Sequence, residues 1–183
     1  MEEMFDIVDE DGNITGEIIS RSTAHQYGIR HRTAHCWLVR KRNNHIEILV
    51  QKRSENKDSY PGCYDISSAG HIPAGVDYRD SAVREIKEEL GIDIKQEELI
   101  YCGKRRYEYT EIFNGHPFHD HEVTNVYMVY VEDPVFTIQE EELSEVRWFE
   151  FNELYEHVVH NTLKHCIMIE ELDKVKAKLK NEL

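Results

Sequence analysis

The chain has 183 residues, of which 22 are basic and 36 acidic, so its formal net charge is −14. This acidic balance argues against nucleic acid or an anionic membrane as a partner. Four scattered cysteines without a C-x-x-C pair favour reduced thiols, and no apolar run approaches the roughly 20 residues that cross a bilayer. A cytoplasmic protein with a single domain over residues 1–183 is therefore expected.

The hydrophobic pattern predicts short strands interleaved with helices along the whole chain. The strands are expected over residues 4–8, 14–19, 33–40, 46–53, 64–69, 99–111, 122–131 and 145–149. The first two form an N-terminal hairpin, 4–19, and the third and fourth form another. The two long strands are expected to be joined through Asn114-Gly115. This order of elements predicts an α/β fold with a mixed sheet between helical layers.

Three of the predicted helices cover residues 20–27, 151–159 and 162–183. The first has Ser22 as its expected cap and Gly28 as its stop. The last carries apolar residues at 4-3-4 spacing, which are Met168, Leu172, Val175 and Leu179. That stripe is expected to pack on the chain's own sheet, and contact with a partner helix is the alternative.

The remaining helix lies in the stretch 70–92, between Asp77 as a suitable N-cap and Gly91 as a C-terminal stop. At about 100° per residue, Glu85, Glu88 and Glu89 share one face of this helix. Like charges four residues apart destabilise a helix by about a few tenths of a kcal/mol. A hard divalent cation such as Mg²⁺ binds carboxylates arranged in this way. The alternative is an ordinary solvated acidic face.

The order of residues in this stretch resembles the signature of the Nudix hydrolases, G-x5-E-x7-R-E-U-x-E-E-x-G-U, in which U is aliphatic. The chain reads R-E-I-K-E-E-L-G-I over residues 84–92, and Gly70 lies fourteen residues before Arg84. The resemblance implies a Nudix-like α/β/α sandwich and hydrolysis of diphosphate linkages with Mg²⁺ or Mn²⁺. It also implies structural roles for Gly70, Arg84 and Gly91.

One position departs from the signature, because Val76 stands where the family has a glutamate. In the family that glutamate is largely a structural partner of the motif arginine. Asp77 or Asp80 is a candidate substitute for it here. The metal-binding end of the signature is complete.

The chain has 11 histidines, a high number for its length. Several lie close to expected strand ends or to acidic residues, and a set that returned to one point would be a metal-site candidate. These are His25, His31, His35, His71, His119 and His121. Their spacing in the sequence does not show whether they converge.

A narrower resemblance covers roughly residues 4–150 and is carried by segments 31–37, 51–57, 60–62 and 68–71. These look like the Nudix subfamily that includes type 1 isopentenyl-diphosphate isomerase. That enzyme binds a metal through three histidines and two acidic side chains. The resemblance implies the same role for His25, His31, His71, Asp120 and Glu122.

The isomerase's diphosphate-binding arginine and lysine match Arg53 and Lys57, a physically sensible clamp for an anionic substrate. Two departures count against isomerase chemistry. Ala69 occupies the position of the essential cysteine, and Cys63 is too far along the chain to replace it. Glu85 stands where the isomerase has a second arginine. These residues favour hydrolysis on a scaffold shared with the isomerase.

The predicted reaction is attack of water on a phosphorus of a diphosphate linkage. Glu85 and Glu89 would be the main Mg²⁺ or Mn²⁺ ligands, and Glu88 a third ligand or the general base. Glu122 is the runner-up for the general base. Arg53 would hold the non-reacting oxygens together with Lys57.

Three functional hypotheses remain open. The first is a hydrolase of nucleoside-diphosphate derivatives or prenyl diphosphates. The second is an isopentenyl-diphosphate isomerase that works without the usual cysteine, and the third is a non-catalytic ligand-binding module. Trp37, Tyr60, Tyr64 and Tyr127 could stack on a base, line a prenyl pocket or pack in the core. A small-molecule diphosphate is the expected partner, and the sequence leaves open a monomer or a homodimer.

Overall fold

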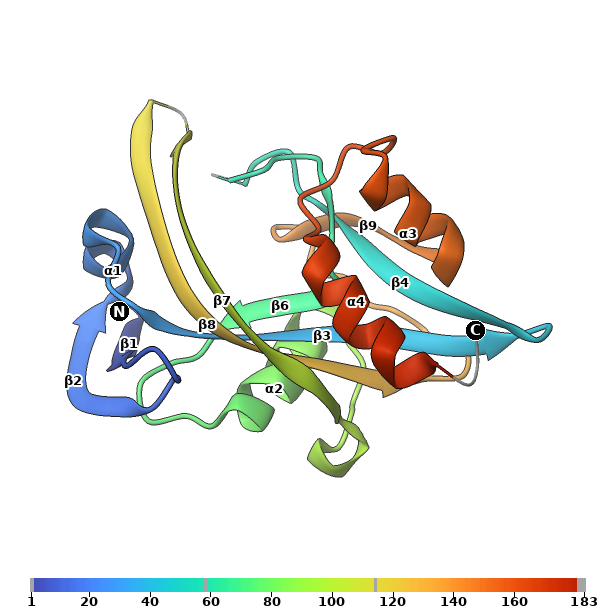
Figure 1. Cartoon of the computed structure of the whole chain (residues 1–183), viewed down its shortest axis with the longest axis horizontal. Helices are drawn as coiled ribbons and strands as arrows, with labels where there is room; N and C mark the ends of the chain where they lie inside the picture. The colour runs from blue at the N-terminus through green and yellow to red at the C-terminus, as the bar shows by residue number, and fades with distance from the viewer. Residues whose placement is uncertain (1, 58, 114, 181–183) are drawn as a thin grey trace.

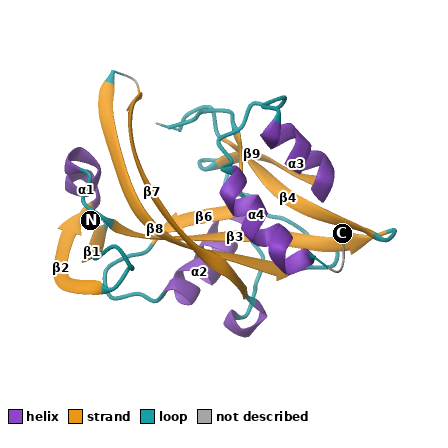
Figure 2. Ribbon diagram, in the orientation of Figure 1, coloured by secondary structure: helices purple, strands orange, loops and turns teal. Residues whose placement is uncertain are grey.

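A mixed sheet of seven strands forms the centre of the fold (Figures 1 and 2). The computed structural model describes residues 2–57, 59–113 and 115–180. The sheet has the order β5-β4-β3-β8-β7, with β6 added beside β3 and β9 beside β4. Its strands are β3 (His31–Arg42), β4 (His45–Arg53), β5 (Tyr64–Asp65), β6 (Ser68–His71), β7 (Ile100–Phe113), β8 (His116–Tyr130) and β9 (Leu143–Glu150). Only β3 and β8 run parallel among these pairs. The predicted α/β architecture is confirmed.

A separate two-stranded hairpin, β1 (Met4–Val8) and β2 (Ile14–Ser20), precedes the sheet and leads into α1 (Arg21–Tyr27). The predicted cap of α1 is wrong by two residues. The side chain of Ser20, rather than Ser22, accepts the backbone N–H of Thr23. Gly28 ends the helix in the left-handed conformation, as predicted.

The helix of the Nudix-like stretch is α2 (Tyr78–Leu90), and its ends agree with the prediction. Asp77 accepts the backbone N–H of Arg79 as N-cap, and Gly91 follows the last turn with φ of 75°. A Cβ at Gly91 would also lie 2.7 Å from Thr137, so both the backbone and the space require glycine here.

Strand β3 separates two hydrophobic cores because its side chains alternate between the faces of the sheet. Cys36 and Leu38 face α2 and pack with Ile86 and Leu90. Trp37, on the other face, belongs to a core that also includes residues of α3 (Phe151–Val159) and α4 (Ile169–Leu179). Figure 1 shows α2 and α4 on opposite faces of the sheet.

The strand predicted over 64–69 is in fact two short strands that pair with different neighbours. Ser67, between them, donates its hydroxyl to the carbonyl of Leu49 and accepts the backbone N–H of Leu38. β5 therefore pairs with β4, whereas β6 pairs with β3. The Ser67 side chain thus takes the place of backbone hydrogen bonds between strands. The alternation of polar and apolar residues in the sequence does not reveal such a break.

The last helix begins later than predicted, at Ile169 instead of residue 162, and residues 181–183 lie outside the described part of the chain. The residues before it form a short parallel bridge to β5. Tyr64 donates its N–H to Lys164 and accepts the N–H of Cys166. The predicted stripe nevertheless packs on the sheet, because Leu172, Val175 and Leu179 are buried in the core and only Met168 stays half-exposed.

Toward their connection, β7 continues two residues past its predicted end and β8 begins six residues before its predicted start, whereas each is one residue shorter than predicted at its other end. Together they form a curved hairpin that rises above the sheet in Figure 1. Helix α3 and strand β9 match the prediction closely. Across the described residues, we find no helix with the length and apolarity to cross a membrane.

Candidate active site

A large cavity of about 1110 Å³ is lined in part by the β7–β8 hairpin. Residues from α1, β3, β6, α2, β7, β8 and α4 line it, together with the loop after β4. Nearly all of the residues predicted to carry chemistry lie on its wall. They are His25, Arg53, Lys57, Gly70, His71, Arg84, Glu85, Glu88, Glu89, Asp120 and Glu122. His31 is fully buried directly behind the wall.

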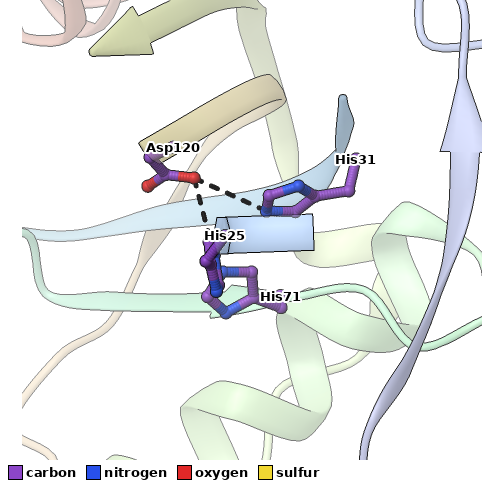
Figure 3. A group of neighbouring side chains, drawn as sticks. All are labelled: His25, His31, His71 and Asp120. Atoms are coloured by element: carbon purple, nitrogen blue, oxygen red, sulfur yellow. Dashed lines mark ion pairs between the residues drawn. The ribbon is translucent and has the colours of Figure 1, made fainter. Parts of the chain in front are cut away.

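Three of the predicted histidines and one aspartate converge on a single point (Figure 3). His25 comes from α1, His31 from β3, His71 from β6 and Asp120 from β8. One ligand atom from each lies within 4.8 Å of every other. Asp120 Oδ1 is 3.6 Å from Nε2 of both His25 and His31. We call these four residues the histidine cluster.

The polar atoms at the centre of the histidine cluster have no hydrogen-bond partner among the described residues. These are Nε2 of His25, His31 and His71 and Oδ1 of Asp120, and all of them are buried. Buried polar atoms are normally paired, because leaving one unpaired costs about 1–3 kcal/mol. Four such atoms facing one point match the ligand set of a divalent metal ion.

The surroundings of the cluster hold its imidazoles in the form that binds a metal. Nδ1–H of His31 donates to the carbonyl of Ile29 at 2.8 Å, which leaves the lone pair on Nε2. Phe5 of the N-terminal hairpin stacks on His31 and on His71, with ring centroids 4.8 and 4.9 Å apart. Burial lowers the pKa of His25 to about 3 and that of His71 well below its usual value. These rings are therefore neutral at pH 7.

The second predicted acidic ligand, Glu122, lies at the edge of the cluster. Its Oε1 is 3.9 Å from His71 Nε2, and its Oε2 accepts the hydroxyl of Thr33 at 3.3 Å. Burial and the nearby carboxylate of Glu122 raise the pKa of Asp120 to about 9. Because the metal-free site favours a proton on Asp120, binding of a metal there would release protons.

The other singled-out histidines do not join this group. His35 pairs with Glu171 of α4, and His119 pairs with the exposed Glu108. His121 accepts from Arg30 and donates to a backbone carbonyl of the turn after α1.

The three carboxylates of α2 share a face, as predicted, but they differ in exposure. Glu89 is buried and accepts the backbone N–H of Ala69 at 3.3 Å. The carboxyl group of Glu85 lies directly over Gly70, where any Cβ would be 2.2 Å from it. Glu88 is 52% exposed and stands at the rim. Glycine at position 70 is what allows Glu85 to reach the cavity.

Burial raises the pKa of Glu85 to about 7, against the opposing effect of Arg84. It raises the pKa of Glu89 to about 8, with the neighbouring Glu85 adding to the effect and the hydrogen bond from the backbone N–H of Ala69 opposing it. Two enclosed carboxyl groups with raised pKa values indicate a place where a cation is needed to keep both ionised.

The prediction that Asp77 or Asp80 pairs with the motif arginine, Arg84, is wrong. Arg84 donates to Glu85 at 2.6 Å and lies 3.8 Å from Glu88, and it contacts neither Asp77 nor Asp80. Asp77 is occupied as the cap of α2, and Asp80 accepts from Gln96. Arg84 instead reaches the backbone carbonyl of His71 at 3.4 Å, which ties α2 to β6. Val76, in place of the family glutamate, packs against the core.

Arg53 and Lys57 both line the cavity, and each is held by an acidic partner. Arg53 donates to Asp65 at 3.2 Å and to the carbonyl of Ser59 at 2.9 Å. Lys57 pairs with Glu142. Both cations are thus fixed in the cavity wall by acidic partners.

Of the aromatic residues considered, Trp37 and Tyr127 are buried in the two cores, and Tyr60 lines the cavity. The sequence reasoning missed two buried charged residues on the cavity wall, Arg105 and Glu171. Glu171 carried a usable signal, because it lies four residues before Val175 and three after Met168, among the apolar positions of the last helix.

The comparisons with known proteins concern the family and the fold of the chain. The family model of the NUDIX domain matches residues 29–167. Nudix hydrolase 3 of Arabidopsis thaliana is 37% identical over 158 residues, which are 83% of this chain and 20% of that protein. An uncharacterised Nudix hydrolase of Clostridium acetobutylicum is 46% identical over 102 residues, 56% of this chain and 48% of that protein. The matches thus span less than half the length of these two relatives.

Isopentenyl-diphosphate Delta-isomerase 1 of Photorhabdus laumondii is 27% identical over 162 residues, which cover 87% of this chain and 86% of that enzyme. Among solved structures, a Deinococcus radiodurans protein superposes with a TM-score of 0.69 at 19% identity, covering 94% of this chain and 98% of that one. This last likeness concerns the fold alone. The matched family model, the α2 signature and the relatives together show that the chain belongs to the Nudix family.

Proposed function

We propose that the chain is a metal-dependent pyrophosphohydrolase that cleaves a diphosphate linkage by attack of water on phosphorus. One observation carries the proposal. Glu85 and Glu89 are enclosed in the same cavity as Arg53 and Lys57, so acidic metal ligands and phosphate-binding cations line one space. The names of the Nudix hydrolase relatives support the same reaction class.

The α2 carboxylates fit a hard divalent cation. Glu85 and Glu89 would hold Mg²⁺ or Mn²⁺, and Glu88 stands at the rim, open to solvent. When bound, such an ion neutralises phosphate oxygens and lowers the pKa of a coordinated water. The raised pKa values of the two enclosed glutamates are the observation that supports the fit.

The histidine cluster fits a second ion of different preference. Three neutral imidazoles and a carboxylate suit a transition metal better than Mg²⁺, which prefers oxygen ligands. The unpartnered Nε2 atoms of His25, His31 and His71 support this assignment. Glu122 would complete the set or serve as the general base that takes the proton of the attacking water, since it lies between the cluster and the open cavity.

The substrate's charge would be met by the chain's own cations. Arg53 can present two N–H groups to one phosphate, and Lys57 adds a point charge beside it. Their present partners, Asp65 and Glu142, would be replaced by phosphate oxygens. Nucleoside-diphosphate derivatives and prenyl diphosphates both carry the group that this clamp recognises.

The second candidate function is isopentenyl-diphosphate isomerisation, which the similarity to the Photorhabdus laumondii enzyme favours. Ala69 argues against it, because it lines the cavity without a thiol at the position of the isomerase cysteine. Cys63 is buried outside the described lining of the cavity, and Cys166 reaches the wall from the loop before α4. Burial raises the pKa of the Cys166 thiol, which makes it a poor proton donor.

The test is release of phosphate or pyrophosphate with Mg²⁺ or Mn²⁺ across a panel of diphosphates. The panel holds nucleotide sugars, dinucleotides, nucleoside di- and triphosphates and prenyl diphosphates, and isopentenyl diphosphate is also checked for a shifted double bond. Metal-dependent release that is lost in Glu89→Gln and kept in the exposed control Glu97→Gln supports hydrolysis. A shifted double bond without release would establish the isomerase instead.

A further inference from the structure

A buried group of three charged or ionisable side chains lies on the cavity wall, apart from the histidine cluster. His35 of β3 donates Nδ1–H to Oε1 of Glu171 at 2.8 Å, and Arg105 of β7 lies 3.2 Å from the same oxygen. The side chains of Glu171 and Arg105 are only 1% and 4% exposed. We call these three residues the buried triad.

The triad is unusual because it interrupts a hydrophobic core. Glu171 is on the face of α4 that buries Leu172 and Val175, and Trp37 follows His35 on the same face of β3. Buried ion pairs are a weak source of stability, since desolvation of the two charges offsets their attraction. An apolar residue at position 171 would continue the stripe of α4. The triad is therefore better explained by what it does in the cavity than by stability.

The position of His35 points to the reaction. In the register of β3 and β6, His35 lies directly opposite Ala69, and opposed side chains stand about 5 Å apart on the same face. Ala69 is next to Gly70, over which Glu85 reaches the cavity, and its N–H binds Glu89. The imidazole of His35 therefore lines the same cavity as the α2 carboxylates, on the face of β6 opposite to the one that Glu85 covers.

The second nitrogen of this imidazole is available to a ligand. Nδ1 is committed to Glu171, whereas Nε2 has no hydrogen-bond partner among the described residues. Nε2 is also not fully enclosed, and the ring lines the cavity with 11% of its side chain exposed. A carboxylate that fixes one imidazole nitrogen and leaves the other on a cavity wall is a typical arrangement for proton transfer.

We propose that His35 is the acid of the hydrolytic reaction, donating its Nε2 proton to the oxygen that leaves phosphorus, with Glu171 and Arg105 as positioning residues. This role rests on the proposed hydrolysis. The bond from the water oxygen to phosphorus forms, and the bond from phosphorus to the bridging oxygen breaks. The water's proton goes to a carboxylate such as Glu122, and the leaving oxygen takes the proton of His35, so charge and protons balance.

The charged groups around His35 favour its protonated form. Burial opposes the charge, but Glu171, which also accepts the hydrogen bond, outweighs burial and raises the pKa of His35. Arg105 from β7 acts in the opposite direction, and Glu122 from β8 adds to the rise. His71 of β6 also interacts electrostatically with His35.

The first test compares two substrates of different leaving groups in His35→Gln. One is the diphosphate hydrolysed in the panel, and the other is the same diphosphate with sulfur in place of the bridging oxygen, whose leaving sulfur gains little from a proton. General acid catalysis contributes about 10²–10⁴-fold. We expect kcat to fall by that factor on the diphosphate and by less than about tenfold on the sulfur analogue. Equal losses on both substrates, in a folded variant, would overturn the role as acid. His119→Gln is the matched control.

The second test separates the triad from the fold. Glu171→Gln keeps the side-chain volume but removes the charge that supports the protonated imidazole. We expect the basic limb of the kcat–pH profile to move to lower pH, with a smaller change in KM. A profile that falls in height without moving would contradict the role of Glu171. Thermal unfolding of each variant establishes that it is folded, and this test remains available if His35→Gln is not.

The third test does not depend on turnover. The Nε2 resonance of His35 is followed by NMR in protein labelled with nitrogen-15 histidine, with Mg²⁺ and methylenediphosphonate added. A shift of His35, absent in the Arg53→Ala variant, is expected from contact with a phosphonate oxygen. A wild-type protein that releases no phosphate but shows this shift would overturn hydrolysis, and with it the role of His35 as an acid, whereas the contact of His35 with the ligand would stand. An unmoved resonance would overturn the contact proposed for His35 even in an active enzyme.

Discussion

Replacing Gly70 by alanine tests the placement of Glu85 without touching any charged group. A Cβ at this position would lie 2.2 Å from Cδ, 2.4 Å from Cγ and 2.5 Å from Oε1 of Glu85. Non-bonded carbon atoms prefer about 3.5–4.0 Å, so the carboxyl group would have to move by more than about 1 Å. The backbone of Gly70 is not in the left-handed region, so the substitution adds no strain of its own.

We expect this change to reduce activity far more than stability. A displacement of about 1 Å at a reacting centre costs about 10²-fold in rate. The free energy of unfolding should fall by only about 1 kcal/mol, at the low end of overpacking, because the end of Glu85 can swing toward solvent. The assay is kcat as a function of Mg²⁺ concentration, beside urea unfolding of the metal-free protein.

A double-mutant cycle supplies the control. In a Glu85→Ala background the new methyl group has nothing to displace, so Gly70→Ala should cause little further loss. Wild-type kcat and Mg²⁺ dependence in the single variant would refute the assignment of Glu85 to the metal site. So would an equal loss in both backgrounds, since that would show that the methyl group acts on something else.

Three further changes separate stability from chemistry. Burial raises the pKa of Glu89 to about 8 from the usual 4.5, so the stability it contributes is present below pH 4.5 and is lost as the pH rises through 8. In EDTA, urea unfolding should show this decline in the wild type and a flatter profile in Glu89→Gln. Gly91→Ala should lower the free energy of unfolding by about 1–3 kcal/mol, because the position has a positive φ and the new Cβ would clash with Thr137. The kcat per folded molecule should stay near that of the wild type. Thr33→Val removes the hydroxyl that donates to Glu122 and should lower kcat by about 10–100-fold. The Thr33→Ser variant keeps a hydroxyl and should recover the activity. An unchanged kcat in Thr33→Val would show that this hydrogen bond is dispensable.

The parts of the fold that follow from local chemistry were predictable. The ends of α2 are fixed by Asp77 and Gly91, whose capping preferences do not depend on distant residues. The start of α4 was not, because residues before Ile169 are drawn into a bridge with Tyr64, about a hundred positions away. Ser67 likewise splits a predicted strand through bonds to β3 and β4 that no local pattern contains.

In the candidate site, too, the features set by local sequence were predictable and those set by distant contacts were not. The carboxylates of α2 could be placed on one face from helical periodicity alone, but their burial depends on how Gly70 passes beneath them. The convergence of His25, His31 and His71 was implied by a resemblance and not by spacing, since α1, β3 and β6 meet only in the assembled sheet. Glu171 could not be connected to His35 at all without the packing of α4.

The connectivity of these residues also bears on how the protein folds. Thr33 and Thr124, which stand beside the histidine cluster on parallel strands, are 91 residues apart, and His35 and Glu171 are 136 apart. Contacts this distant require large loops to close before they contribute anything, so folds that rely on them form slowly. A growing chain that lacks α4 would have its carboxylate helix but an incomplete cavity. Catalytic competence should therefore appear only with the last cooperative phase of refolding, after most helical signal has returned.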